Sequence, residues 1–199
     1  MILSLTVEFA LSLDAAFTTF PIITTKRLRL REIRMDDAEA LYTIFSNEEV
    51  MKFHGSPTQI TMDDTIRWIE RVQTRYSKRE AFRWGITLHG QDTVIGTCSF
   101  HGLNEAHHYV ELGYELHRDY WGQGIMTEAV SAVLDFGFTE LGMNRVEARI
   151  DIANERSKKL LERLGFTYEG YLRQRFFLGD RYDDDHYFGL LKHEWLGRR

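Results

Sequence analysis

The sequence has a single cysteine and no long apolar run. Its 199 residues include only Cys98, so no disulfide can form within the chain. A chain without disulfides fits a reducing compartment, and we therefore expect a cytoplasmic protein. No uninterrupted apolar segment approaches the roughly 20 residues that a membrane-spanning helix needs, so we expect no membrane partner. Repeats, linkers and low-complexity tracts are also absent from the sequence.

An excess of basic charge is also lacking. Lysine and arginine together number 25, against 30 aspartate and glutamate residues, which gives a formal net charge of -5. Proteins that bind nucleic acid normally carry a basic patch or stripe, so this balance argues against a nucleic-acid partner. The mild acidity is compatible with a cationic partner such as an amine or a basic peptide end.

No metal site is expected. His101, His107 and His108 lie near Glu105, but no pair has the helical two-histidine spacing of a metalloprotease. We interpret this segment as a polar loop. The acidic run 183–185 lacks the alternating ligand positions of a calcium loop and is interpreted as a solvated corner.

The length favours one domain with a core large enough to fold alone. Residues 1–23 are treated apart from it, because they are fairly apolar but carry Glu8 and Asp14. They contain no lysine or arginine, so they lack the positive start of a secretory signal. We interpret 1–23 as an N-terminal arm or an extra strand, which leaves 24–199 as the single domain.

Apolar periodicity predicts the secondary structure of this domain. Alternating apolar residues predict strands over 26–33, 81–88, 93–100, 109–116, 145–152, 174–178 and 186–192. Helical spacing predicts helices over 36–45, 61–76, 127–141 and 155–164, with a loop over 47–59. Strand and helix signals that alternate, together with antiparallel hairpins, indicate a mixed α/β sheet.

A turn with two glycines lies between the predicted strand 109–116 and the helix that follows. Gly122 and Gly124 let the backbone bend sharply and let a ligand approach closely. The free amides at the start of the helix then favour an anion such as a phosphate or pyrophosphate. The turn lacks the Lys-Ser/Thr ending of a nucleoside triphosphate loop. On these residues alone, an ordinary strand–helix connection that needs glycine explains the turn equally well.

Three blocks, in order along the chain, resemble the GCN5-related N-acetyltransferases, and in particular the branch of ribosomal-protein N-terminal acetyltransferases. The blocks are 112–129, 154–166 and 185–195, and the resemblance runs from about Thr24 to the C-terminus. It implies an α+β fold in which helices flank a central, mixed, mostly antiparallel twisted sheet. It also implies that the sheet is splayed at the strand 109–116 and that acetyl-CoA is the co-substrate.

The resemblance also assigns the residues that bind acetyl-CoA. Backbone amides of the turn would face the pyrophosphate, Leu116 would pair with the pantetheine arm, and Asn154 would lie near the thiol. The turn residues are Gly122, Gln123, Gly124, Ile125, Met126 and Thr127. The family often has glutamine or arginine three residues before the first glycine, where this chain has Asp119. We therefore expect less help from side chains at this point.

Catalytic roles are assigned in the same way. Glu111 matches a glutamate that relatives use to accept the proton of the amine, and a surface or ion-paired residue is the alternative. A tyrosine that commonly serves as the acid is replaced here by Leu161. Ser157 and Asn154 remain near the thiol position, although Asn154 is equally well explained as a helix cap. Tyr114 and Tyr187 are further candidates for the general acid.

The predicted function is acetyl transfer to a primary amine. The acceptor implied by the branch is the N-terminal amine of a ribosomal or other protein. The alternatives are a small amine such as a polyamine, an amino acid or an antibiotic, and a non-catalytic sensor that binds acyl-CoA. Phe53, His54 and Trp68 either contact the substrate or belong to the core. The apolar N-terminal arm leaves a homodimer open.

Overall fold

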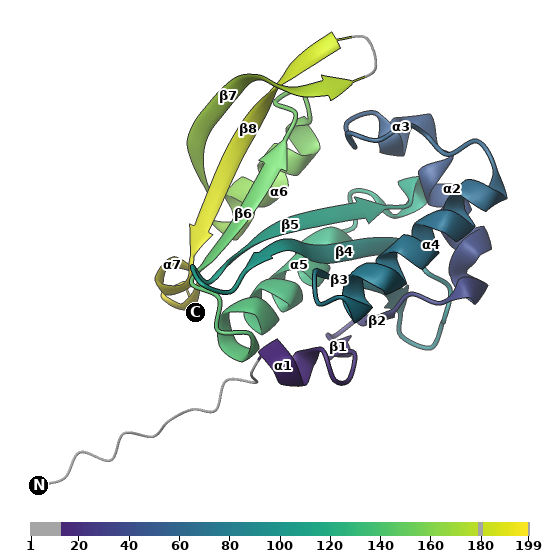
Figure 1. The fold of residues 1–199 in the computed structure, drawn as a ribbon, viewed down its shortest axis with the longest axis horizontal. Coiled ribbons are helices and arrows are strands. Elements are labelled where there is room, and N and C mark those ends of the chain that lie inside the picture. The colour runs from purple at the N-terminus through teal and green to yellow at the C-terminus, as the bar shows by residue number, and fades with distance from the viewer. Residues whose placement is uncertain (1–12, 179–180, 199) are drawn as a thin grey trace, which may run out of the picture.

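A computed structural model describes residues 13–178 and 181–198. The strands are β1 Ile23–Thr24, β2 Leu28–Glu32, β3 Ala81–Leu88, β4 Gly96–Asn104, β5 Tyr109–Leu116, β6 Arg145–Ile150, β7 Thr167–Leu178 and β8 Arg181–Leu191. The α-helices are α1 Leu13–Ala16, α2 Ala38–Phe45, α3 Glu48–Met51, α4 Met62–Ser77, α5 Ile125–Asp135, α6 Glu155–Leu164 and α7 Lys192–Leu196. The strands form one sheet in the order β1-β2-β3-β4-β5-β6-β8-β7 (Figure 1).

The sheet is antiparallel except where β5 meets β6. These two strands pair in parallel only over Tyr109 to Glu111 on β5 and Arg145 to Glu147 on β6. β5 then continues to Leu116 without a partner on that side, and the two strands diverge (Figure 1). The predicted splay is thus present, and it leaves backbone groups of β5 free to pair with something other than the protein.

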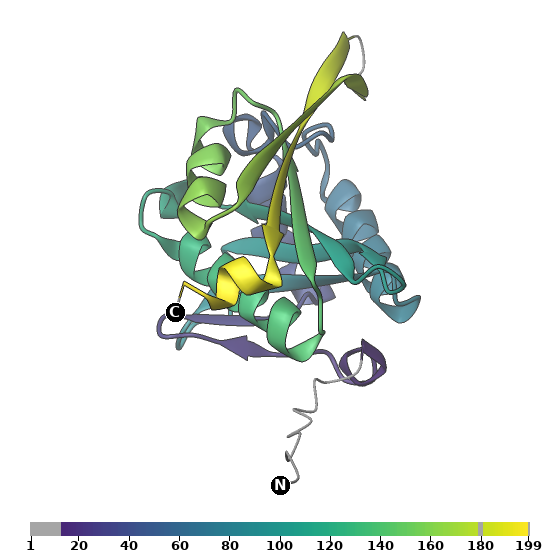
Figure 2. The ribbon, with the colours of Figure 1, turned by 90° about the vertical axis from the view of Figure 1, so that its left-hand side faces the viewer.

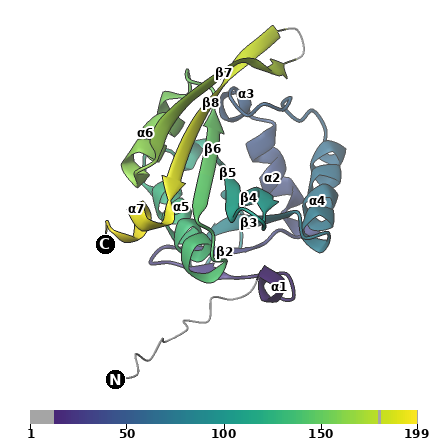
Figure 3. The ribbon, with the colours of Figure 1, turned by 60° about the vertical axis from the view of Figure 1, so that its left-hand side comes forward.

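Helices cover both faces of the sheet. Figure 3 shows α5 and α6 on one face and α2 and α4 on the other. The larger core lies under α5 and α6, where the strands present Phe82, Trp84 and Phe100. Gly137, just past α5, is required there, because a Cβ atom at this position would lie 2.7 Å from the Phe100 ring. The smaller core lies under α2 and α4.

The segment before β1 packs on the sheet. The Phe17 ring stacks on Phe82 with 4.2 Å between centroids, and the Trp84 indole donates a hydrogen bond to the Pro21 carbonyl at 2.7 Å. These contacts belong to residues 13–22. The first twelve residues lie outside the described part of the chain, so the division at residue 23 stays a prediction.

Buried polar contacts fix the helices on the second face. The Arg31 guanidinium pairs with the Asp37 carboxylate at 2.7 Å, and both side chains are almost fully buried at the start of α2. Thr61 caps α4, with Asp64 completing a capping box. Between these anchored helices, α3 and the loop after it are held beside the gap between β5 and β6.

The last two long strands extend away from the body of the domain as a hairpin (Figure 2). β8 pairs with β6 from Ile150 to Arg145, and the outer part of the hairpin continues past that contact. No helix in the described ranges is both long enough and apolar enough to span a bilayer.

Candidate active site

Two cavities meet at the gap between β5 and β6. The larger has a volume of about 740 Å³ and extends from the glycine turn to the start of α6. The smaller, of about 340 Å³, lies on the β5 face that carries Glu111. The residues that line both cavities are Phe53, His54, Tyr114, Glu115, Asn154 and Ser157. This junction is where a group from one cavity can meet a group from the other.

The glycine turn forms one end of the larger cavity. Gly122 and Gly124 have φ angles of +75° and +72°, in the left-handed region that favours glycine. Gly124 is also the N-cap of α5. Among the described residues, no hydrogen bond uses the amide groups of 122–127. A row of free amides at a helix N-terminus is suited to bind an anion.

The structure brings most of the predicted donor-binding residues to this cavity. Those that line it are Leu116, Gly122, Gly124, Ile125, Met126, Thr127 and Asn154. Gln123 does not line it; its side-chain amide donates to the Asp119 carbonyl at 2.8 Å. The Asp119 carboxylate is exposed and also lies outside the lining.

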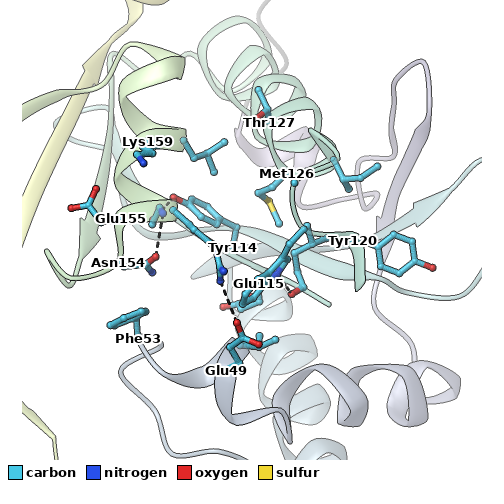
Figure 4. Close-up of a pocket in the computed structure, with 18 of the residues that line it drawn as sticks. Glu49, Phe53, Tyr114, Glu115, Tyr120, Met126, Thr127, Asn154, Glu155 and Lys159 are labelled. Carbon is cyan, nitrogen blue, oxygen red and sulfur yellow. Dashed lines mark hydrogen bonds and ion pairs between the residues drawn. The ribbon is translucent and has the colours of Figure 1, made fainter. Parts of the chain in front are cut away.

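A cluster missed by the sequence analysis spans the larger cavity between α3 and α6. The guanidinium groups of Arg118 and Arg156 both lie over the Trp121 indole, with their central carbons 4.7 and 4.1 Å from the ring centroid. The Glu49 carboxylate is 2.7 Å from Arg118 Nε and 3.6 Å from Arg156 Nη1. These four residues form one cluster of cation–π contacts and ion pairs. Figure 4 shows Glu49 on the α3 side of the cavity, opposite Asn154 and the rest of α6.

Ser157 and Tyr114 are hydrogen-bonded to each other at the junction. Their hydroxyl oxygens are 2.6 Å apart. Burial raises the pKa of the Tyr114 phenol, so this group keeps its proton at neutral pH. Asn154 Oδ1 accepts the Ser157 amide at 3.1 Å, which makes Asn154 the helix cap as well as a lining residue. Leu161 is fully buried in the core and does not line the cavity.

Other candidates from the sequence divide between the cavities and the interior. Phe53 and His54 line both cavities, in line with a contact to substrate. Trp68 packs against the smaller core and lines neither cavity. The Tyr187 hydroxyl donates to the Asp185 carboxylate at 3.4 Å and also lies outside both linings. Of the two tyrosines considered as the general acid, only Tyr114 therefore lies at the cavities.

Glu111 lines only the smaller cavity and forms an ion pair there. Arg149 Nε donates to its carboxylate at 2.7 Å, and His101 Nε2 lies 3.8 Å away. Burial raises the pKa of Glu111, while the Arg149 charge acts in the opposite direction. The structure therefore shows Glu111 in an ion pair with Arg149, as the alternative interpretation of this residue expects. A carboxyl whose pKa is raised can still accept a proton near neutral pH, so the base role stays a prediction.

Glu115 is a buried junction residue that the sequence analysis did not select. Its carboxylate contacts His54 Nε2 and Arg83 Nη1, each at 2.7 Å, and accepts a hydrogen bond from Thr97. Burial alone would raise the pKa of Glu115, but Arg83, His54 and Thr97 together lower it to about 2. Glu115 therefore stays ionised, and it links His54, Arg83 and Thr97 at the junction of the two cavities.

Comparison with known proteins identifies the family. Residues 27–167 match the acetyltransferase (GNAT) domain family. The chain is 38% identical over 173 residues to the uncharacterized N-acetyltransferase YoaA of Bacillus subtilis, a match that covers 87% of this chain and 98% of that protein. The chain belongs to the GNAT acetyltransferase family. It is an N-acetyltransferase, and the family predicted from three sequence blocks is confirmed.

Other GNAT relatives support the branch and the fold. The chain is 28% identical over 134 residues to the ribosomal-protein-serine acetyltransferase of Escherichia coli, a match that covers 62% of this chain and 75% of that protein. A crystal structure of a GNAT-family acetyltransferase from Bacillus anthracis has a TM-score of 0.78 at 26% identity, covering 87% of this chain and 100% of that one. The predicted fold class, a mostly antiparallel mixed sheet flanked by helices, is confirmed.

Three further features of the sequence were considered as possible sites: the histidines with Glu105, the acidic run 183–185 and Cys98. No group of histidine, cysteine, aspartate or glutamate in the described ranges could hold a metal ion. In the acidic run, Asp185 pairs with Arg149 at 3.0 Å. The Asp184 carboxylate accepts a hydrogen bond from the Gln174 backbone amide at 2.9 Å. Cys98 is fully buried, and burial raises the pKa of its thiol, so it is unsuited to act as a nucleophile.

Proposed function

We propose that this N-acetyltransferase uses acetyl-CoA to acetylate the N-terminal amine of a ribosomal or other protein. The observation that carries the proposal is the row of free amides at 122–127, at one end of a cavity that leads to the hydroxyl pair of Ser157 and Tyr114. The single cysteine of the chain supports the cytoplasm as its place of action.

The donor is proposed to lie along the unpaired edge of β5. The amides of 122–127 would hold its diphosphate, and the backbone before Leu116 would pair with the pantetheine arm. This path ends at Ser157, beside Asn154 at the start of α6. Acetyl-CoA supplies an acetyl group that is activated as a thioester.

The acceptor is proposed to occupy the smaller cavity. Its lining carries an excess of acidic residues: Glu111, Glu115, Asp151, Asp183, Asp184 and Asp185, against Arg83 and Arg149. His101 does not offset this excess, because burial and the nearby Arg83 lower its pKa to about 4 and leave it neutral. A net negative cavity attracts a cationic amine. The same excess favours a polyamine as the second candidate acceptor.

The chain's own groups can then move the two protons that the reaction requires. Glu111 accepts a proton from the ammonium group, directly or through water, and leaves a neutral amine. Ser157 donates its hydroxyl proton to the departing thiolate and regains a proton from the amine nitrogen, which loses its second proton as the amide forms. Tyr114 keeps its own proton and holds the Ser157 hydroxyl in place. Bringing donor and acceptor together at the junction supplies much of the remaining acceleration.

Calorimetric titration tests the donor site. Purified protein is titrated with acetyl-CoA, free CoA and ATP in separate experiments. We expect both CoA forms to bind and ATP not to bind, because the gap beside β5 is shaped for an extended arm in addition to a diphosphate. Binding of ATP without binding of CoA would contradict the proposal.

Thiol release on turnover tests the acceptor. Acetyl-CoA is mixed with peptides that begin with serine or other residues, and separately with spermidine. A clear preference for peptides supports N-terminal acetylation, whereas a preference for spermidine would make a polyamine the acceptor. Tight binding of acetyl-CoA without turnover on any amine would indicate a sensor and contradict both.

Glu111→Gln is expected to lower turnover about 100-fold at neutral pH, because the amide cannot accept the proton. Since burial raises the pKa of Glu111, wild-type activity should fall as the pH drops through that pKa. The variant should lack this acidic limb in a pH–rate profile. Glu147→Gln is the matched control: Glu147 pairs with Glu111 in the sheet register, binds Arg145 and lines neither cavity. If Glu111→Gln has the same pH–rate profile as the wild type, Glu111 is not the base.

A further inference from the structure

Arg27 lies far from the glycine turn in the sequence but contacts it in the fold. It precedes β2, and its Nη1 donates to the Gln123 carbonyl at 3.0 Å across 96 residues. Its Nε donates to the Glu128 carboxylate at 2.6 Å, and its backbone amide donates to the same carboxylate at 2.9 Å. Thr25 adds a fourth contact, at 2.5 Å to Glu128. The chain before β2 is thus bound to both the turn and the first turn of α5.

Three carbonyl groups in and before the turn are taken by side-chain donors. The Trp121 indole binds the Leu116 carbonyl at 2.9 Å, and the Gln123 side chain binds the Asp119 carbonyl at 2.8 Å. Arg27 takes the third carbonyl, that of Gln123. The amides of 122–127 have no partner within the described chain. The turn therefore presents donors to the cavity while these carbonyls are held by the protein.

Glu128 gives Arg27 a second role. A carboxylate in the first turn of α5 lies near the same helix N-terminus that would hold a diphosphate, and two anions there repel each other. Arg27 and Thr25 bind this carboxylate and outweigh the burial that would otherwise raise its pKa. Arg27 itself does not line the cavity. The contacts by which it can shape the cavity are those to Gln123 and Glu128.

We propose that Arg27 is a positioning residue for the diphosphate of the acyl donor. It holds the Gln123 carbonyl out of the cavity and neutralises Glu128, so that the amides of the turn face the phosphates without a competing anion. The inference rests on the proposed use of acetyl-CoA. It adds a residue that lies outside the three sequence blocks and reaches the turn only through the fold.

The test compares two donors. S-acetyl-pantetheine carries the same thioester and arm as acetyl-CoA but lacks the diphosphate. For Arg27→Ala we expect the KM for acetyl-CoA to rise about tenfold with kcat unchanged, because the turn that binds the diphosphate loses the charge-assisted contacts that hold it. With S-acetyl-pantetheine, kcat/KM should equal that of the wild type. Arg27→Lys keeps the charge and should recover part of the KM.

The control is Arg29→Ala, which removes an exposed arginine two residues further along the chain, on β2, whose ion-pair partner Asp92 is 3.9 Å away. This variant should leave both donors unaffected. An unchanged KM for acetyl-CoA in Arg27→Ala, or equal losses with both donors, would overturn the inference while leaving the proposed function standing. Wild-type protein that does not bind acetyl-CoA would overturn both.

Discussion

Gly124→Val is expected to lower the affinity for acetyl-CoA on the order of 100-fold. Gly124 has a φ of +72°, which a β-branched residue adopts only at a substantial energetic cost. The strained turn would shift, and the amides that follow would no longer converge on one anion. A Cβ atom here would lie in ordinary contact, 3.6 Å from Arg27 Nη2, and the valine methyl groups beyond it would reach the side chain that holds the turn.

Gly90→Val provides the matched control, measured by the same calorimetric titration. Gly90 has a φ of +77°, a Cβ atom added to it would meet no atom within 4 Å, and it lies in the turn between β3 and β4. Both variants should lose stability from backbone strain, as thermal melting would show. Only Gly124→Val should lose affinity. Equal affinity in the two variants would remove the glycine turn from the donor site.

Glu115→Gln is expected to lower the free energy of unfolding by about 3 kcal/mol at neutral pH. The substitution leaves the Arg83 guanidinium, which is largely buried, without its counter-charge. The folded pKa of Glu115, about 2, lies below its ordinary value of 4.5. Its ionisation therefore stabilises the folded state above about pH 4.5, and this contribution is lost as the pH falls toward 2.

Urea unfolding at several pH values measures this contribution. The wild type should lose stability between about pH 5 and pH 2 by more than Glu115→Gln does, because the variant has already lost the Glu115 contribution. Glu105→Gln, at an exposed carboxylate in the turn between β4 and β5, should follow the wild type. Parallel pH dependences for the wild type and Glu115→Gln would show that the buried ion pair contributes nothing.

Local patterns predict most of the strands and the glycine turn, although β4 extends to Asn104 and β7 begins at Thr167. The alternation around Gly113 predicts a strand over 109–116, and β5 has those bounds. Helix 127–141 is less accurate at both ends: α5 begins two residues earlier, at Ile125, and the last turn, Phe136–Glu140, is a π-helix. Gly137 in that turn packs closely against Phe100 of the sheet, a contact between distant residues that helical periodicity does not indicate.

Short elements and distant partners cannot be predicted from local patterns. The sequence predicts a loop over 47–59, but the structure has α3 there. This helix has only four residues and so carries no apolar period; its cap, Asn47, is the one local signal. Glu115 is 32 residues from Arg83 and 61 from His54. Such pairs form only when strands and loops come together, so only the fold reveals them.

One catalytic assignment shows an intermediate case. Alternation places Glu111 and Arg149 on polar faces of their strands, and both patterns are visible in the sequence. The parallel register of β5 and β6 pairs Glu111 with Glu147, and Arg149, two residues further along β6, reaches the Glu111 carboxylate at 2.7 Å. The sequence alone leaves the base and ion-pair alternatives for Glu111 open, because it does not give the register of these two strands.

The burial of Cys98 makes it a reporter of how often the sheet opens. It lies on β4, paired with Trp84 on one side and Tyr114 on the other, and its side chain is fully buried. A thiol reagent reacts with the thiolate, which forms only after the sheet has separated at this point. With excess reagent, the rate of modification measures the opening kinetics of the native protein. Because β5 also forms the proposed donor site, a bound acyl donor should prolong the lifetime of the closed sheet.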